Sequence, residues 1–518
     1  MLVSLFNDVI GPVMRGPSSS HCAAALRIGR LARDLMGGEI ASVLVEYDRH
    51  GALASTHRSQ GSDMGLFGGL LGWDAVDERL PRSAQAIREA GVDVRTETVD
   101  AHDEHPNTYR LTLANAREQH TLAAVSTGGG MVEVIEIDGA PVSIAGDYWE
   151  TLAMLDHKGD MDIEAARRAL GADEVMAHRS KTGTLAQIKA QRFIDERELA
   201  ATVGKPRWTR RLAPVLPVLS RRNMSVPFAS CNEMFEHDGD RNSPLWRLAA
   251  EYEAARGAIS TDEVLARMTD LVRIVRRSVE QGVAGSHYED RILGWQSGRF
   301  KERLEKRRLL DAGMLNRIVL YVTALMEVKS SMGVILAAPT AGACAALPGA
   351  CLAAADSLEL GDEAAAKAML AGGIIGVFIA AHSTFAAEVC GCQAECGAAS
   401  GMAAAALCAL AGGDARQCVA AASMALQSTL GMVCTPVANR VEVPCLSNNV
   451  LAASNALSCA NMALADYDPV IPLDEVIDAM DRVGRALPRE LRCTGLGGLS
   501  TTPTAKRLER QLERKSEQ

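Results

Sequence analysis

The sequence lacks any long block of lysine and arginine. Its 54 basic residues are outnumbered by 64 acidic ones, so the formal net charge is −10 at pH 7. A basic face is what attracts nucleic acid and other polyanions. We therefore expect no nucleic-acid partner.

Aromatic residues are also scarce, at 4% of the chain, and three long segments lack charge altogether. Residues 331–355, 368–387 and 396–413 contain no Lys, Arg, Asp or Glu and approach the length of a membrane span. A membrane carrier is thus one alternative. However, the sequence contains no Trp or Tyr between Tyr321 and Tyr467 that would form an interfacial belt, and the segments are rich in Ala and Gly. We predict buried bundle helices and no membrane partner.

A basic leader is missing as well, because Asp8 follows only a few apolar residues. The chain has 13 cysteines, an odd number that does not suit a complete disulfide framework. Free thiols are typical of a reducing compartment. We therefore expect a cytoplasmic protein.

A chain of 518 residues predicts two or three domains. Helical spacing over residues 21–36, with Ser20 before it and two glycines after it, predicts a helix. Strand patterns follow at 40–47, 108–113 and 132–137. We predict an α+β N-terminal domain over 1–140, a connector or inserted region over 141–245 with a helix-like stretch around 181–211, and a mostly α-helical catalytic domain over 246–518.

Three cysteines stand out because they lack the C-x-x-C spacing of ordinary zinc and ferredoxin sites. They are Cys392, Cys434 and Cys445, and only folding can bring them together. The last two lie beside helix-ending prolines, where a thiol makes a better metal ligand than in mid-helix. Three such thiols would bind an iron-sulfur cluster with one iron left open. Five others lie in Ala-rich runs and are predicted to pack as core residues: Cys344, Cys351, Cys408, Cys418 and Cys459.

Four further segments carry polar or glycine residues that suit a binding site. Residues 16–21, Gly-Pro-Ser-Ser-Ser-His, precede the first helix and suit a carboxylate or phosphate, although one serine could simply cap that helix. The glycines at 128–130 fit either a ligand turn or a hairpin loop. His57 and Asp63 fit either a general base or a solvated loop. Pro339 and Gly342 interrupt an apolar run, which leaves backbone groups that need partners.

Seven motifs occur in one order along the chain. They are Gly-Pro-Ser-Ser-Ser-His at 16–21, Ser-Thr-Gly-Gly-Gly at 126–130, Ala-Pro-Thr-Ala-Gly at 338–342, Gly-Cys-Gln-Ala-Glu at 391–395, Cys-Thr-Pro at 434–436, Val-Pro-Cys at 443–445 and Leu-Gly-Gly-Leu at 496–499. In this set and order the chain resembles the iron-sulfur-dependent L-serine dehydratase (L-serine ammonia-lyase) family in its single-chain form. The resemblance implies a [4Fe-4S] cluster on Cys392, Cys434 and Cys445, a β-type N-terminal domain and an α-type helical domain.

The resemblance also implies the reaction and its residues. Loss of water from L-serine would give an enamine, which tautomerises and hydrolyses to pyruvate and ammonia. The open iron, acting as a Lewis acid, would bind the substrate hydroxyl. His57 or His21 would take the α-proton, and Ser18, Ser19, Ser20 and Thr340 would grip the carboxylate. The remaining predicted substrate-binding residues are Gly16, Gln60, Ser62, Asp63, Gly128, Gly129, Ala341, Gly342 and Arg440.

Four departures from the family pattern concern the substrate. Gln60 stands in place of a histidine, Ala341 in place of the Asn of Thr-Asn-Gly, Thr435 in place of the Asp of Cys-Asp-Pro, and Ala438-Asn439 in place of Gly-Gly. They favour a divergent branch that acts on another small β-substituted amino acid. Arg440 would bind the second carboxylate of a dicarboxylic hydroxy amino acid.

Two alternatives of other classes remain, besides the membrane carrier. An iron-sulfur redox sensor would hold the cluster without turnover. A pyridoxal-phosphate enzyme would catalyse the same reaction, but no lysine lies in a context that indicates a Schiff base. We expect a homodimer, because two-fold pairs dominate soluble oligomers.

Overall fold

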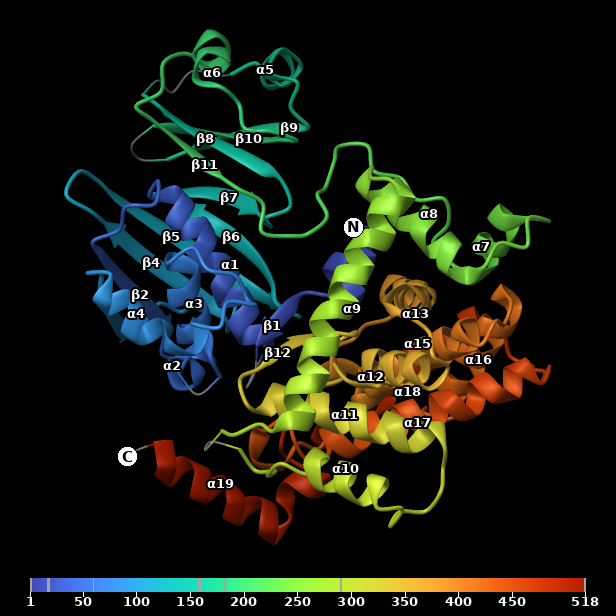
Figure 1. Cartoon of the computed structure of the whole chain (residues 1–518). Helices are drawn as coiled ribbons and strands as arrows, with labels where there is room; N and C mark the ends of the chain where they lie inside the picture. The colour runs from blue at the N-terminus through green and yellow to red at the C-terminus, as the bar shows by residue number, and fades with distance from the viewer. Residues whose placement is uncertain are drawn as a thin grey trace. The chain divides into compact units, whose positions relative to one another are not determined.

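The computed structural model describes residues 2–15, 19–58, 60–156, 161–180, 183–288 and 291–516. The chain forms two compact units (Figure 1). The sheet unit is Ser18–Met224, and the helical unit is Met1–Pro17 together with Ser225–Gln518. The predicted fold class, an α+β part followed by a mostly α-helical part, is confirmed. The predicted segments were 1–140, 141–245 and 246–518, whereas the two units divide the chain after Pro17 and after Met224.

The sheet unit contains a six-stranded sheet in the order β3-β2-β4-β5-β6-β7. Its strands are β2 (Ser42–Asp48), β3 (Asp93–Val99), β4 (Thr108–Ala114), β5 (Gln119–Gly128), β6 (Met131–Ile137) and β7 (Ala140–Ile144). The β2–β3 pair is parallel and the other neighbours are antiparallel. The strands predicted at 40–47, 108–113 and 132–137 are therefore confirmed.

Four helices accompany this sheet: α1 (Ser19–Leu35), α2 (Leu53–Thr56), α3 (Ser62–Leu70) and α4 (Ser83–Glu89). The helix predicted at 21–36 is confirmed as α1. It begins at Ser19, so Ser20 lies in its first turn and not before it. Gly37 and Gly38 end the helix with positive φ angles, as the sequence predicted.

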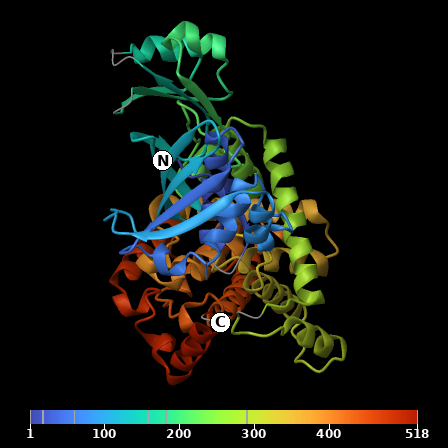
Figure 2. The same cartoon turned by 90° about the vertical axis from the view of Figure 1, so that its left-hand side faces the viewer.

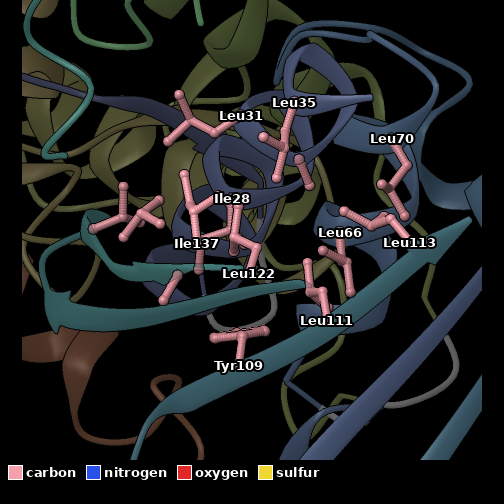
Figure 3. Packing of buried hydrophobic residues seen from close by; sticks show 14 of the residues in the cluster. Ile28, Leu31, Leu35, Leu66, Leu70, Tyr109, Leu111, Leu113, Leu122 and Ile137 are labelled. Carbon is pink, nitrogen blue, oxygen red and sulfur yellow. The ribbon is translucent and has the colours of Figure 1, made fainter. Parts of the chain in front are cut away.

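The core of the sheet unit lies between α1, α3 and the strands (Figure 3). Alternate residues of β4 share one face, so Tyr109, Leu111 and Leu113 all enter this core. Ile28 and Leu66 meet them from α1 and α3 (Figure 3). The same packing holds the first turns of α1 and α3 in place, and predicted site residues of this unit lie at these N-terminal ends.

Helices α1 and α3 approach at glycines. A Cβ at Gly69 would lie 2.8 Å from the backbone nitrogen of Arg30 and would overlap the carbonyl oxygen of Leu26. We expect Gly69→Ala to lower the free energy of unfolding by about 1–3 kcal/mol through overpacking. Denaturant unfolding measures this. Gly361→Ala, where nothing lies within 4 Å of a Cβ, is the matched control, and equal losses in the two variants would contradict the prediction.

A second, four-stranded antiparallel sheet follows in the order β11-β8-β10-β9. Its elements are β8 (Trp149–Leu155), α5 (Ile163–Leu170), β9 (Glu174–Arg179), β10 (Thr184–Ala190), α6 (Glu196–Val203) and β11 (Trp208–Leu212). The two helices lie together on one face of this sheet (Figures 1 and 2). The helix predicted around 181–211 is wrong except for α6. β10 is buried on both faces, so its sequence does not show the alternation of a half-exposed strand.

Glu150 of β8 is a fully buried carboxyl. The side-chain amide of Gln187 donates to its Oε2 atom at 3.2 Å, and its Oε1 atom has no hydrogen-bond partner in the described part of the chain. Burial raises the pKa of Glu150 from 4.5 to about 8.

This carboxyl predicts a pH-dependent stability. Between pH 4.5 and 8 the folded chain keeps a proton that the unfolded chain has lost, so the free energy of unfolding falls as the pH rises, by roughly 3–5 kcal/mol in total. Glu150→Gln cannot titrate, so we expect a flatter pH dependence and a higher free energy of unfolding than the parent's above pH 8. Urea unfolding followed by the fluorescence of Trp149 and Trp208 measures this. Equal pH slopes for parent and variant would contradict it.

The helical unit packs around α15 (Cys396–Leu410), which contacts α12, α13, α16 and α17 (Figure 1). The other helices are α7 (Cys231–Asp238), α8 (Leu245–Gly257), α9 (Thr261–Ala284), α10 (Ser297–Glu305), α11 (Met314–Ser330), α12 (Ala346–Ser357), α13 (Asp362–His382), α14 (Ala387–Cys390), α16 (Ala415–Gln427), α17 (Cys445–Leu464), α18 (Leu473–Ala486) and α19 (Pro503–Ser516). The three uncharged segments supply α12, α13 and α15, which are buried as predicted.

Within the described residues, one helix is long and apolar enough to cross a membrane. It is α13, and 78% of its most apolar stretch is buried inside the protein. A core helix meets the same criteria of length and composition, so this finding is weak support for the membrane alternative.

The first residues of the chain fold with the helical unit. The short strands β1 (Val13–Arg15) and β12 (Val334–Leu336) pair antiparallel. The buried carboxylate of Glu253 in α8 accepts hydrogen bonds from the Ser4 hydroxyl at 2.6 Å and from the Leu5 backbone at 2.8 Å. The segment before residue 16 is thereby fixed to the helices.

Candidate functional site

Three segments of the helical unit hold the predicted cysteine ligands. Cys392 begins a short 3₁₀ turn between α14 and α15, Cys434 lies in an extended segment bridged to Arg492, and Cys445 is the first residue of α17. Their side chains are buried, with exposed fractions of 2%, 5% and 6%. Each thiol therefore lies where a helix begins or the chain is extended, as the flanking prolines and glycines predicted.

The three thiols lie close enough to influence one another electrostatically. Cys392 acts on both Cys434 and Cys445. The pKa of Cys434 is raised, first by a hydrogen bond with the thiol of Cys493 and then by burial. Burial raises the pKa of Cys445, and the ammonium of Lys329 opposes this. The backbone N–H of Cys493 also donates to the carbonyl oxygen of Cys434 at 2.9 Å.

The donor set fits an iron-sulfur cluster better than a single ion. Within the described residues, no three His, Cys, Asp or Glu side chains are grouped closely enough to hold one metal ion. In a cluster each thiolate binds a different iron, so the sulfur atoms lie farther apart than ligands of one ion. The three buried thiols supply the kind of ligand that such a cluster takes.

Asn449 links the thiol segments to the Pro-Gly loop after β12. Its side-chain amide donates to the carbonyl of Gly342 at 2.7 Å and to that of Cys445 at 2.8 Å, and its Oδ1 atom accepts from the backbone of Ala345 and Ala346. The stranded backbone groups expected at this loop thus find a partner. The only sequence signal for Asn449 is a polar residue one turn after Cys445 in an Ala-rich helix.

Glu395 is a second residue that sequence reasoning did not assign to the site. The hydroxyl of Thr340 donates to its Oε1 atom at 2.6 Å. Thr340 was predicted to bind the carboxylate of the substrate, but in the structure it binds this carboxylate of the protein itself. A Cβ at Gly342 would lie 2.6 Å from the same oxygen, so glycine allows this approach. Burial raises the pKa of Glu395 to about 7.

Lys329 and Arg440 supply positive charge near the thiols. Lys329, in the last turn of α11, is 1% exposed, and burial lowers its pKa while the thiol of Cys445 acts in the opposite direction. Arg440 is partly buried, and its charge acts on the carboxylate of Glu442. The predicted substrate-binding residue Ala341 is partly buried beside Gly342.

In the sheet unit, His57 and Asp63 form a partly buried pair. The Nδ1 atom of His57 lies 2.7 Å from a carboxylate oxygen of Asp63, and the two side chains are 13% and 18% exposed. The ring of Tyr47 lies 4.9 Å from the imidazole ring. The structure therefore brings these residues together in a semi-enclosed site, where the sequence left a solvated loop as an alternative.

Polar groups without partners surround this pair. Gln60 Oε1 and the hydroxyl of Tyr47 are buried and lack a hydrogen-bond partner among the described residues. Tyr109 lies beside Ser62, and burial raises the pKa of its hydroxyl. Unsatisfied buried groups cost free energy, so their gathering here is typical of a site that binds a polar ligand. Tyr47 and Tyr109 were not predicted, because in the sequence they are ordinary strand residues.

The remaining predicted residues lie at the start of α1 or in a hairpin. Gly16 and Ser18 fall outside the described residues, and only the backbone of Ser19 and Ser20 is described, within α1. Burial lowers the pKa of His21. Gly128 and Gly129 have positive φ angles in the turn between β5 and β6, which fits the hairpin loop that the sequence left open.

Comparisons with known proteins agree with these observations. The family model described as serine dehydratase alpha chain matches residues 240–500. The chain is 36% identical to the probable L-serine dehydratase, alpha chain, of Bacillus subtilis (strain 168), over 48% of this chain and 84% of that protein. It is 40% identical to the probable beta chain of the same organism, over 27% of this chain and 63% of that protein. L-serine dehydratase 2 of Escherichia coli (strain K12) is 26% identical over 96% of this chain and 98% of that protein.

Proposed function

Because the chain belongs to the L-serine dehydratase family of lyases, we propose that it converts L-serine to pyruvate and ammonia. Elimination of water gives an enamine, which tautomerises to an imine and takes up water again as it releases ammonia. We propose that Cys392, Cys434 and Cys445 hold a [4Fe-4S] cluster. The observation that supports this proposal is the burial of these three thiols from separate segments, together with the hydrogen bond that Asn448, in the first turn of α17 after Cys445, donates to the sulfur of Cys392 at 3.4 Å. When bound, the cluster supplies a Lewis-acidic iron that assists departure of the hydroxyl group.

The residues of the sheet unit support a role in proton transfer and carboxylate binding. The carboxylate of Asp63 orients the imidazole of His57 through Nδ1, which leaves Nε2 to accept the α-proton. His21 remains the second candidate base, since a lowered pKa keeps its imidazole neutral and able to accept a proton. The first turn of α1, with Ser19 and Ser20, presents backbone N–H groups that suit the substrate carboxylate.

Anaerobic isolation followed by iron and sulfide analysis tests the cluster, and an assay for 2-oxo acid and ammonia tests the reaction. We expect iron and sulfide in equal amounts and pyruvate from L-serine. A chain that binds no iron after anaerobic reconstitution, or that forms no 2-oxo acid, overturns the proposal. An iron-loaded chain without turnover supports the redox sensor instead.

The same assay decides between L-serine and a dicarboxylic hydroxy amino acid such as 3-hydroxyaspartate. Preference for 3-hydroxyaspartate, lost in Arg440→Ala, would support the alternative substrate. Retention of that preference in Arg440→Ala would remove Arg440 from substrate binding. We further propose a cytoplasmic homodimer, which the free thiols and the general prevalence of two-fold pairs support.

A further inference from the structure

Lys329 is a buried ammonium group that is only partly satisfied. It is 1% exposed, and its Nζ atom donates to the carbonyl oxygen of Val441 at 2.5 Å. An ammonium carries three donors, and within the described residues this carbonyl is its one hydrogen-bond partner. An uncompensated buried charge costs several kcal/mol, so the fold keeps it at a considerable cost.

The groups facing Lys329 do not neutralise it. The ionisable groups around it are the thiols of Cys445 and Cys344 and the carboxyl groups of Glu442 and Glu395. Burial raises the pKa of both thiols, so they carry no charge that compensates the ammonium. The Glu442 carboxylate is engaged elsewhere, because it accepts from the backbone of Ile292 and of Leu293, both at 2.9 Å. The Glu395 carboxyl is held by Thr340. In the part of the chain that is described, neither carboxylate forms an ion pair with Lys329.

Lys329 lies beside the segment that leads into a thiol of the candidate site, because its Nζ atom donates to Val441, shortly before Cys445. Cys445 begins α17, and α17 packs against α11, which carries Lys329 near its end. Three thiolates give a bound cluster a net negative charge, and such charge together with its surroundings sets the reduction potential and the stability of a cluster. The anion that Lys329 lacks is therefore supplied when the site is loaded.

We propose that Lys329 is the fixed positive charge that compensates the thiolate-bound cluster, a positioning residue that increases cluster retention and raises its reduction potential. This inference rests on the proposed function, since it requires a cluster on Cys392, Cys434 and Cys445. It has a signature that a purely structural lysine lacks. The charge destabilises the metal-free chain and stabilises the loaded one.

The test compares Lys329→Met and Lys329→Arg in the full chain, isolated anaerobically. We expect iron to leave Lys329→Met for a chelator at least about tenfold faster, a loss typical for an outer-shell partner. The one-electron equilibrium of the cluster should shift about tenfold toward the oxidised form. This corresponds to a reduction potential 59 mV more negative than the parent's. In the metal-free state Lys329→Met should unfold at a higher temperature than the parent. Lys329→Arg keeps the charge and should stay within about twofold of the parent in iron loss.

Lys301→Met is the matched control, because Lys301 is a half-exposed lysine of α10 and its loss should change neither iron retention nor potential. Unchanged retention and potential in Lys329→Met would overturn the inference while leaving the proposed function intact. A parent chain without iron would overturn both. Should Lys329→Met not fold, Lys329→Gln carries the same expectations.

Discussion

Replacing Cys392, Cys434 or Cys445 by serine is expected to abolish cluster binding and turnover together. Each of the three thiols is buried, and a serine hydroxyl does not supply the thiolate by which an iron-sulfur cluster is held. Loss of an outer-shell partner typically costs 10–100-fold in metal affinity, and loss of a direct ligand should exceed about 100-fold. Iron and sulfide analysis, with visible absorbance and the pyruvate assay, measures both effects in the same preparations.

Cys459→Ser is the matched control for these variants. Cys459 is also a buried cysteine of α17, 3% exposed, but the structure places it in the packed part of that helix. Its replacement should leave iron and turnover unchanged and should cost only a little stability. Full iron and full activity in any one of the three ligand variants would remove that cysteine from the cluster.

The sequence singled out the three candidate cysteines because each lies at a break in regular structure. Proline and glycine beside Cys434, Cys445 and Cys392 mark such breaks without any knowledge of the fold. Asn449 and Lys329 carry no such mark. Both residues lie inside helices. Only the packing reveals that Asn449 links the Pro-Gly loop to α17 and that Lys329 lies near the thiol of Cys445.

The fold was predicted best where one physical signal dominates. Uncharged Ala-rich segments can only be buried, and they became α12, α13 and α15. The four-stranded sheet was missed because β8 and β10 are covered on both faces, by helices and by other strands, which removes the period-two pattern. The pairing of β1 with β12 was also unpredictable, since it joins segments far apart in the sequence.

His57→Ala is expected to lower kcat by about 10²–10⁴-fold, the range for loss of a general base. Asp63 orients the imidazole at 2.7 Å, so Asp63→Asn should lower kcat as well, but by less. Both variants should keep an iron content close to that of the parent, because neither residue is a proposed cluster ligand. Steady-state kinetics on preparations of equal iron content separates a chemical defect from a loading defect.

Two further variants decide between the candidate bases. His50→Ala is the control, because the side chain of His50 is 61% exposed in the same unit and its loss should leave kcat unchanged. His21→Ala should have a smaller effect than His57→Ala, since the carboxylate of Asp63 orients the imidazole ring of His57. If the large loss of kcat follows His21 and not His57, then the partly buried His57–Asp63 pair is structural and proton abstraction belongs to the start of α1.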